Sequence, residues 1–400
     1  MTSTAAPLSA AEVDAIRAAT PFAPDRIHLN HAGDSPSSSA VLATQTDHLR
    51  LESEIGGYEA AMARADADAA VYDSIATLLG CDPTEIARKE HATDAWNAGF
   101  WSIPMEPGQR ILTAEAAYGA NAVAFLHAER ARGVQVEVVP SDPSGQVDVD
   151  QLSTRLGPDV ALVALTHVPT NGGLINPAAE VGALANAAGV PFLLDACQST
   201  GHLDLDVGQL GCDLLSATGR KYLRGPRGTG FLYASNAIID RLVPATPDHH
   251  GATWSAGRRY DLAPDARRFE HWEYNHAAWL ALGTAVDEAL EIGLDRIEAT
   301  ILDRADGLRR ALDTAGFPVF DLGQRRCGIV TTGVAGVAAE QAKEHLSAHG
   351  INVSVAAPVS TRWDAERRQL EPMLRLSIHA HTTADEVGRA VEALGSITND

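Results

Sequence analysis

The chain has 400 residues, of which 45% are hydrophobic, and its 31 Lys and Arg against 52 Asp and Glu give a formal net charge of -21. This length predicts two domains, or one large α/β domain with an appendage. The excess of acidic residues argues against a partner made of nucleic acid or an anionic membrane surface.

Targeting and redox features of the sequence are sparse. No apolar run approaches the roughly 20 residues that cross a bilayer, and the N-terminus lacks the basic and apolar regions of a secretory signal. The four cysteines, Cys81, Cys197, Cys212 and Cys327, form neither a CxxC pair nor a zinc-binding spacing. We therefore expect a cytoplasmic protein with reduced thiols and no metal site.

The N-terminal part is predicted to be mainly helical. A first helix begins near Ser9 and ends at Thr20-Pro21, because proline disfavours helical geometry in the residue before it. An Ala-rich stretch from about Ser39 to Leu79 follows, and Gly56-Gly57 is expected to break it.

The middle of the chain alternates strands with helices. Pro177 opens a helix that runs through Ala188, and Gly189 ends it. This alternation predicts a parallel sheet covered on both faces, with ligands bound at the carboxyl ends of the strands. Asp195 ends one such strand. The strands are predicted at Arg110–Thr113, Val134–Val139, Val160–Val168 and Pro191–Ala196.

After about Tyr260 the regular alternation of strands and helices ends, and the remaining elements predict a smaller α+β domain. It contains a helical region over Trp279–Ala315, short strands near Gly328–Val334 and Met373–Ile378, and a final helix over Ala384–Leu394. We place the boundary near residues 260–290, with residues 25–275 in the large domain and residues 1–24 and 276–400 in the small one.

Two clusters have residue types that suit a phosphorylated pyridine ring. In the segment from Glu90 to Trp96, Thr93 at a helix start offers a hydroxyl and free backbone N–H groups to a phosphate. In Asp195-Ala196-Cys197-Gln198, a carboxylate at the end of a buried strand needs a partner such as a protonated pyridine nitrogen. Gln198 can then reach the phenolic oxygen of the same ring.

A third cluster supplies a candidate nucleophile. Thr218 and Arg220 can bind a phosphate, and Lys221 can reach an aldehyde carbon. Lysine is a usable nucleophile only when its pKa is lowered. The glycine-rich turn that follows, from Gly225 to Gly230, lets the backbone reverse tightly.

In this order, the three clusters resemble the class V aminotransferase family of fold-type I enzymes that use pyridoxal 5′-phosphate (PLP). The family includes cysteine desulfurases, isopenicillin N epimerase and the C–S lyase of ergothioneine biosynthesis, and the resemblance runs from about His28 to about Thr383. It implies an α/β fold, with a large domain built on a mostly parallel sheet of seven strands and a smaller C-terminal α+β domain. It also implies a homodimer.

The resemblance assigns roles to individual residues. Lys221 matches the lysine that holds PLP as a Schiff base, Asp195 the partner of the ring nitrogen, and Gln198 the partner of the ring oxygen O3′. Tyr118 matches the aromatic residue stacked on the cofactor, and Arg375 the residue that binds the substrate α-carboxylate. The phosphate-binding positions match Ala92, Thr93, Thr218 and Arg220. A further polar residue facing the ring oxygen is Thr170 or Asn171, and the sequence leaves both open.

Three departures from the desulfurase pattern bear on the reaction. The segment 356–363 lacks the cysteine that desulfurases carry on a mobile loop, so persulfide chemistry on a loop thiol is not expected. Trp272-Glu273 replaces the glycine-threonine pair that reaches the neighbouring subunit's phosphate. Third, the segment that normally lines the substrate pocket reads Asn30-His31-Ala32-Gly33 here, which makes His31 and Gly33 candidate substrate contacts. Separately, Gly56-Gly57-Tyr58 looks most like the ergothioneine-pathway lyases, with Tyr58 near the pocket entrance.

These features favour a β-lyase that acts on a cysteine S-conjugate, a small amino-acid substrate. Lys221 would remove the α-proton, and the β-thiolate would leave, with pyruvate and ammonia as the final products. Alternatives in the same fold are an aminotransferase, an epimerase or a decarboxylating oxidative deaminase. An alternative of another class is a non-catalytic binding subunit with the PLP fold.

Overall fold

The computed structural model describes residues 5–23 and 25–397, and a sheet of seven strands lies at its centre. β8 is antiparallel to both of its neighbours, β2 and β7, and the strands beyond β7 pair in parallel. The predicted α/β fold with a mostly parallel sheet is thus confirmed. The order is β2 (Ile86–Lys89), β8 (Gly230–Ala234), β7 (Leu214–Thr218), β6 (Phe192–Asp195), β5 (Val160–Thr166), β3 (Arg110–Ala114) and β4 (Gln135–Val139).

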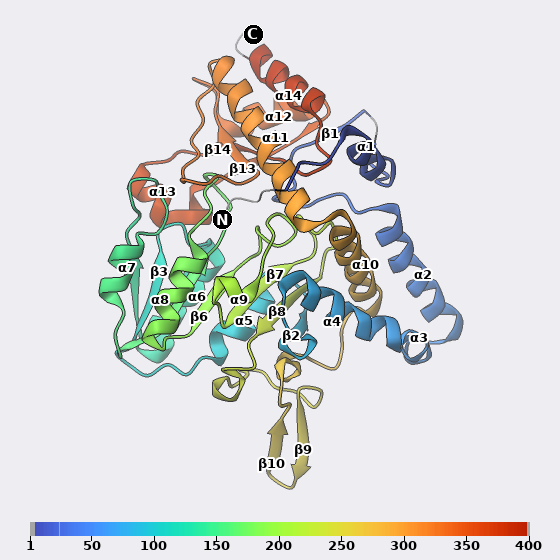
Figure 1. Cartoon of the computed structure of the whole chain (residues 1–400), viewed down its shortest axis with the longest axis vertical. Coiled ribbons are helices and arrows are strands. Elements are labelled where there is room, and N and C mark those ends of the chain that lie inside the picture. Colours follow the sequence, from blue (N-terminus) through green and yellow to red (C-terminus); the bar gives the residue numbers. More distant parts are fainter. Residues whose placement is uncertain (1–4, 24, 398–400) are drawn as a thin grey trace.

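Both faces of the sheet are buried, as the continuous apolar strands require. Leu194 and Leu215 belong to one core cluster, whereas their neighbours Leu193 and Leu214 belong to another. Successive side chains of a strand point to opposite faces, so the two clusters are the two sides of one sheet. The helices among these strands are α5 (Ala92–Ser102), α6 (Gly119–Arg132), α7 (Val149–Arg155), α8 (Ala178–Ala188) and α9 (Val207–Leu210) (Figure 1).

The predicted N-terminal helical stretch forms three helices, α2 (Ser39–Ile55), α3 (Gly57–Ala63) and α4 (Ala65–Leu79). The expected break occurs at Gly56, whose φ of 101° suits a residue without a Cβ. A second break at Arg64 was not predicted. α2 and α4 pack against α10 (His276–Ile292) (Figure 1).

The C-terminal part contains its own small sheet, in which β14 (Met373–Ser377) lies between β11 (Ile329–Thr332) and β13 (Ser354–Ala356). The helical region expected over Trp279–Ala315 is interrupted at Gly293, where α10 gives way to α11 (Leu294–Thr314). The remaining helices here are α12 (Ala339–Ala348), α13 (Arg362–Arg368) and α14 (Ala384–Ser396). Short 3-10 helices lie at Pro83–Glu85, Ile239–Arg241, Ala266–Phe269 and Pro358–Thr361.

The beginning of the chain packs on this C-terminal part. In α1 (Ala10–Ala18), Arg17 forms an ion pair with Glu386 of α14 at 2.9 Å. β1 (Ile27–His28) pairs in parallel with β12 (Ile351–Asn352). The segment that follows β1 then leads to the functional site described below, where Ala32 and Gly33 contact two of its residues.

A two-stranded hairpin projects from the body of the molecule, at the bottom of Figure 1. It consists of β9 (Ala252–Ala256) and β10 (Arg259–Leu262). Trp254 and Tyr260 are paired across the hairpin and are 77% and 57% exposed. The sequence analysis did not identify this element.

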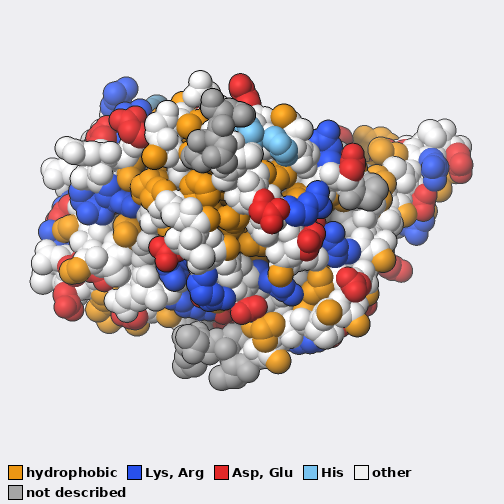
Figure 2. All heavy atoms as spheres, turned by 90° about the horizontal axis from the view of Figure 1, so that it is seen from above, with side chains coloured by type: hydrophobic (Ala, Val, Ile, Leu, Met, Phe, Trp, Pro, Cys, Tyr) orange, Lys and Arg blue, Asp and Glu red, His pale blue; other side chains and the backbone are white. Residues whose placement is uncertain are grey.

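The face in Figure 2 carries Lys and Arg side chains interspersed with Asp and Glu, and apolar side chains lie between them. The net acidic charge is therefore not gathered into one patch on that face. Among the residues that the structure describes, no helix is both long and apolar enough to cross a membrane.

Candidate active site

A cavity of about 270 Å³ opens at the carboxyl end of the parallel strands. It brings together segments that are far apart in the sequence, because β5, β6 and β7 all end at this edge. Nine of the residues predicted for the site line it: Ala92, Thr93, Tyr118, Thr170, Asp195, Gln198, Thr218, Arg220 and Lys221.

Asp195 forms the floor of the cavity at the end of β6. Its Oδ1 accepts a hydrogen bond from the backbone N–H of Cys197 at 3.0 Å, and its Oδ2 accepts one from Nδ2 of Asn121 at 2.8 Å. Burial raises the pKa of Asp195, whereas these two hydrogen bonds and the charge of Lys221 oppose the rise. The carboxyl group is thus buried, held by two hydrogen-bond donors, and close enough to Lys221 to interact with it electrostatically.

Lys221 is 8% exposed and belongs to the turn that follows β7. Burial lowers the pKa of its ammonium group, and the nearby charges of Arg220 and Arg375 lower it further. The side chain of Cys197 interacts with Lys221 and opposes this effect. A lowered pKa increases the fraction of neutral lysine amine, which is the form that reacts with carbonyl groups.

The other end of the cavity is suited to an anion. Ala92 and Thr93 are the first residues of α5, where backbone N–H groups lack intrahelical acceptors and the helix dipole favours negative charge. Thr218 and Arg220 add a hydroxyl and a guanidinium group from the end of β7. Gly219 lies between them, and a Cβ there would collide with the side chain of Thr229.

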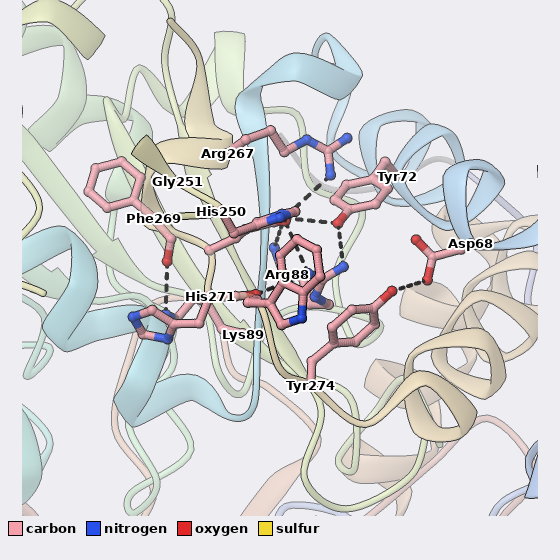
Figure 3. Close-up of polar contacts among 12 residues, drawn as sticks. Asp68, Tyr72, Arg88, Lys89, His250, Gly251, Arg267, Phe269, His271 and Tyr274 are labelled. Carbon is pink, nitrogen blue, oxygen red and sulfur yellow. Dashed lines mark hydrogen bonds and ion pairs between the residues drawn. The ribbon is translucent and has the colours of Figure 1, made fainter. Parts of the chain in front are cut away.

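Strand β2, which leads into α5, is anchored by a buried ion network. Figure 3 shows Tyr72, Arg88, Arg267 and His250 converging on one point. That point is the carboxylate of Glu270, which is 1% exposed and accepts hydrogen bonds from the Arg88 backbone at 2.7 Å and Tyr72 at 2.9 Å. Burial would raise the pKa of Glu270, but the His250 hydrogen bond and the charges of both arginines outweigh it and lower the pKa. The network fixes the strand that positions the anion-binding helix.

Arg375 does not line the cavity itself but contacts a residue that does. Its Nη1 donates to Oγ1 of Thr170 at 2.6 Å, and its Nη2 donates to Oδ1 of Asn30 at 3.3 Å. It is 8% exposed, and its Nε lacks a hydrogen-bond partner within the described chain. Thr170 therefore separates Arg375 from the cavity in this structure.

The two residues that the sequence left open point in different directions. Thr170 lines the cavity, and Nε2 of Gln198 lies 3.4 Å from its Oγ1. Nδ2 of Asn171 instead donates to the backbone oxygen of Ala357 at 3.2 Å and to Thr361 at 3.3 Å. Asn171 thus ties the strand end to the segment 356–363.

The segment after β1 lies behind the cavity. The backbone oxygen of Ala32 accepts a hydrogen bond from Nε2 of Gln198 at 3.0 Å, and that of Gly33 accepts one from Arg220. His31 is 1% exposed and does not line the cavity, because its ring packs among His28, His379 and His381. Gly33 contacts the site through its backbone, whereas His31 faces away from it.

Tyr58 lies in α3 with 72% of its surface exposed, and it does not line the cavity of its own chain. Several lining residues were not predicted, among them Asn121, Cys197 and Arg227. Cys197 is next to Asp195 in a motif that the sequence analysis quoted. Asn121 lies in the first turn of α6, the helix whose N-cap residue is Tyr118.

The polar atoms around the cavity fit PLP. Gln198 Oε1, Ser216 Oγ and Trp96 Nε1 are buried, have no partner in the described chain, and belong to lining residues. Buried polar atoms are rarely left unpaired, so these atoms indicate a polar occupant. A carboxylate at one end suits a pyridinium nitrogen, and the helix start with Thr218 and Arg220 at the other suits a phosphate. In residues 5–23 and 25–397, no group of three or more His, Cys, Asp or Glu is arranged to bind a metal ion.

The fold and the cavity define an enzyme that depends on PLP. A family model described as "Aminotransferase class-V" matches residues 27–390, and the chain belongs to this family. It is 30% identical over 384 residues to a probable hercynylcysteine sulfoxide lyase of Mycobacterium tuberculosis (strain CDC 1551 / Oshkosh), covering 93% of this chain and 90% of that protein. It is 28% identical to the isopenicillin N epimerase of Streptomyces clavuligerus, over 82% of this chain and 84% of the epimerase.

Solved structures support the same fold. The apo structure of a cysteine desulfurase from Thermococcus onnurineus NA1 superimposes with a TM-score of 0.89 at 21% identity, covering 96% of this chain and 98% of the other. At this identity the likeness concerns the architecture alone.

Proposed function

We propose that the protein is a PLP-dependent C–S β-lyase that cleaves a cysteine S-conjugate into a thiol, pyruvate and ammonia. The observation that carries the proposal is that Lys221, Asp195 and an anion-binding helix start share one cavity, with Arg375 directly behind its wall. The similarity to a probable hercynylcysteine sulfoxide lyase supports C–S bond cleavage as the reaction.

The positions of the cysteines favour a lyase over a desulfurase that stores sulfur on a loop thiol. The segment 356–363 contains no cysteine. Cys327 is fully buried, and burial raises the pKa of its thiol to about 12, so it is a poor nucleophile. Cys197 lines the cavity, but burial raises its thiol pKa as well.

Each residue then has a defined task. Lys221 would hold PLP covalently, and its Nζ, when free, would take the proton from the substrate Cα. Asp195 would pair with the ring nitrogen, Gln198 and Thr170 would hold the ring oxygen, and Tyr118 would pack on the ring. Arg375 binds the substrate α-carboxylate as a two-pronged donor, with Thr170 giving way to it.

Bound PLP supplies the electron sink that makes the Cα proton removable. The electron pair left at Cα forms a double bond to Cβ as the C–S bond breaks, and the sulfur leaves as a thiolate. Water then hydrolyses the released three-carbon enamine to pyruvate and ammonia. Thr93, Thr218 and Arg220 would hold the phosphate of PLP.

The test uses the PLP-loaded enzyme and a panel of cysteine S-conjugates and their sulfoxides. Pyruvate and the sulfur-containing product are measured in parallel, and equal amounts of both from at least one conjugate support the lyase. Lys221→Ala is the matched control and should form neither. A protein that binds PLP but yields no pyruvate, and instead needs an amino acceptor, produces a D-amino acid or releases CO₂, would contradict the proposal.

We also propose that the enzyme is a homodimer in which the β9–β10 hairpin contacts the second copy. A free two-stranded hairpin is marginally stable in water, and the exposed pair of Trp254 and Tyr260 offers it an apolar surface to bury. Light scattering during size-exclusion chromatography should give twice the chain mass, and Trp254→Glu should shift the protein toward the monomer. A monomeric wild-type protein would contradict this arrangement.

A further inference from the structure

Asn121 is a buried residue of the cavity to which the proposed function assigns no task. It lies in the first turn of α6, is 3% exposed, and lines the cavity. Tyr118 caps the same helix three residues earlier and also lines the cavity. The N-cap and the first turn of α6 thus present both side chains to the cavity.

The amide of Asn121 is aimed at the carboxylate of Asp195. Its Nδ2 donates to Oδ2 at 2.8 Å, across 74 positions of the sequence. The other oxygen, Oδ1, is held by the backbone N–H of Cys197 at 3.0 Å. Each carboxylate oxygen therefore has one donor from the protein and keeps a second lone pair for a ligand.

Burial raises the pKa of Asp195, and the hydrogen bonds from Cys197 and Asn121 and the charge of Lys221 oppose this rise. Asp195 is 5% exposed, and the titratable groups that act on it are Lys221, the Cys197 thiol and the Tyr118 hydroxyl. The neighbouring strand positions, Thr166 on β5 and Ser216 on β7, carry no charge. Asn121 is the uncharged side chain that stabilises the ionised form by hydrogen bonding, since an amide N–H donor favours a carboxylate over a carboxylic acid.

We propose that Asn121 is a positioning residue that orients Asp195 toward the ring nitrogen of PLP and keeps it ionised. Tyr118 and Asn121 then act on the cofactor from one helical turn, Tyr118 on the face of the ring and Asn121 through Asp195 on its edge. The inference concerns cofactor binding, so it holds whichever reaction the enzyme catalyses.

A packing role makes a different prediction from a positioning role. If Asn121 only fills space, Leu of similar volume replaces it without affecting PLP. If it supplies a donor, Asn121→Leu binds PLP weakly at every pH, whereas Asn121→Asp depends on pH. In Asn121→Asp, the new carboxyl group and that of Asp195 share one proton at low pH, and this proton restores a hydrogen-bond donor to Asp195. At high pH the proton is lost and so is the donor.

The experiment titrates the apo forms of both variants with PLP and follows the visible absorbance and the quenching of protein fluorescence at about pH 8 and about pH 6. All dissociation constants are divided by the wild-type value at the same pH. Loss of a hydrogen bond to a charged group predicts PLP binding about ten to a hundred times weaker for both variants at the higher pH. At the lower pH Asn121→Asp should recover most of this loss and Asn121→Leu none.

Asn236→Asp is the control, because Asn236 is an exposed asparagine whose amide also donates to a neighbouring side chain, that of Thr84 at 3.1 Å. It should bind PLP like the wild type at both pH values. Far-UV circular dichroism and urea unfolding establish whether each variant is folded. If one of the two Asn121 variants does not fold, Asn121→Ser, whose hydroxyl is also a hydrogen-bond donor, is used in its place. Wild-type affinity in Asn121→Leu, or an Asn121→Asp defect that does not change with pH, would overturn the proposal.

Discussion

Acid should destabilise this protein through its buried histidines, and His202 gives the clearest case. Its Nε2 accepts a hydrogen bond from the backbone N–H of Gly328 at 2.9 Å, so the proton is on Nδ1, which donates to the backbone oxygen of Gln198 at 2.9 Å. A second proton would displace the Gly328 donor inside a fully buried site. Burial accordingly lowers the pKa of His202 to about 3.

The sign of the effect follows from where the protons bind. The unfolded chain takes up a proton at this histidine near pH 6.5, whereas the folded chain does so only near pH 3. Between these values the unfolded state binds more protons, so stability is fully present above about pH 6.5 and is lost as the pH falls. From about pH 7 to about pH 5, His202 alone removes about 2 kcal/mol of folding free energy.

His379 adds a similar loss, because burial lowers its pKa to about 3 as well. Its Nε2 donates to the backbone oxygen of Tyr222 at 3.0 Å, and its Nδ1 faces that of His381 at 3.1 Å. Together the two histidines predict a loss of about 4 kcal/mol over this pH range, a large share of a typical stability of about 5–15 kcal/mol.

The assay is urea unfolding of the PLP-saturated protein at the two pH values, compared with His202→Gln. Glutamine retains an acceptor for the Gly328 N–H and does not titrate, so the variant should lose about 2 kcal/mol less than the wild type on acidification. His349→Gln removes an exposed histidine and should leave the wild-type loss unchanged. An equal loss in wild type and His202→Gln would refute the assignment of acid sensitivity to this residue.

The remaining predictions concern the cofactor, the substrate and the ion network. Lys221→Ala should abolish the visible absorbance of the covalently bound cofactor and all pyruvate formation, and a retained band would move the attachment elsewhere. Arg375→Lys should raise KM at least about tenfold with a smaller effect on kcat, because lysine cannot bind a carboxylate with two parallel donors; an unchanged KM with a lower kcat would argue against carboxylate binding. Glu270→Ala should lower the free energy of unfolding by about 3–5 kcal/mol, since it leaves Arg88 buried without its counter-charge, and a loss below about 1 kcal/mol in urea unfolding would contradict this reading of the network.

Local patterns in the sequence predicted four of the seven strands of the central sheet, β3, β4, β5 and β6, but not β2, β7 and β8. The strand that ends at Asp195 was visible as an apolar run that stops at a carboxylate, and Lys221 follows another strand end by a few residues. β7, the strand before Lys221, was not predicted from the pattern, so it was the resemblance of the three clusters to a known family that indicated a shared site for Lys221 and Asp195. Short segments therefore sufficed for this part of the cavity.

Contacts between distant segments were not predictable in the same way. Asn121 reaches Asp195 across 74 positions, and nothing around it distinguishes it from a solvent-facing residue of an Ala-rich helix. Tyr58 illustrates the converse, because a Gly-Gly-Tyr sequence does not specify where a helix points, and α3 places the ring at the surface. The second helix break, at Arg64, could not be predicted either, because no glycine or proline marks it in the sequence.

The segment after β1 has a consequence for the order in which the enzyme matures. Oxygen atoms from Asn30, Ala32 and Gly33 hold three side chains of the site, and one of these, Arg375, is near the end of the chain. During synthesis the ribosome makes these N-terminal acceptors first, and it makes Arg375 only after all the residues that line the cavity. A chain that terminates before β14 would therefore contain every residue that lines the cavity but would lack Arg375, the residue proposed to bind the substrate carboxylate.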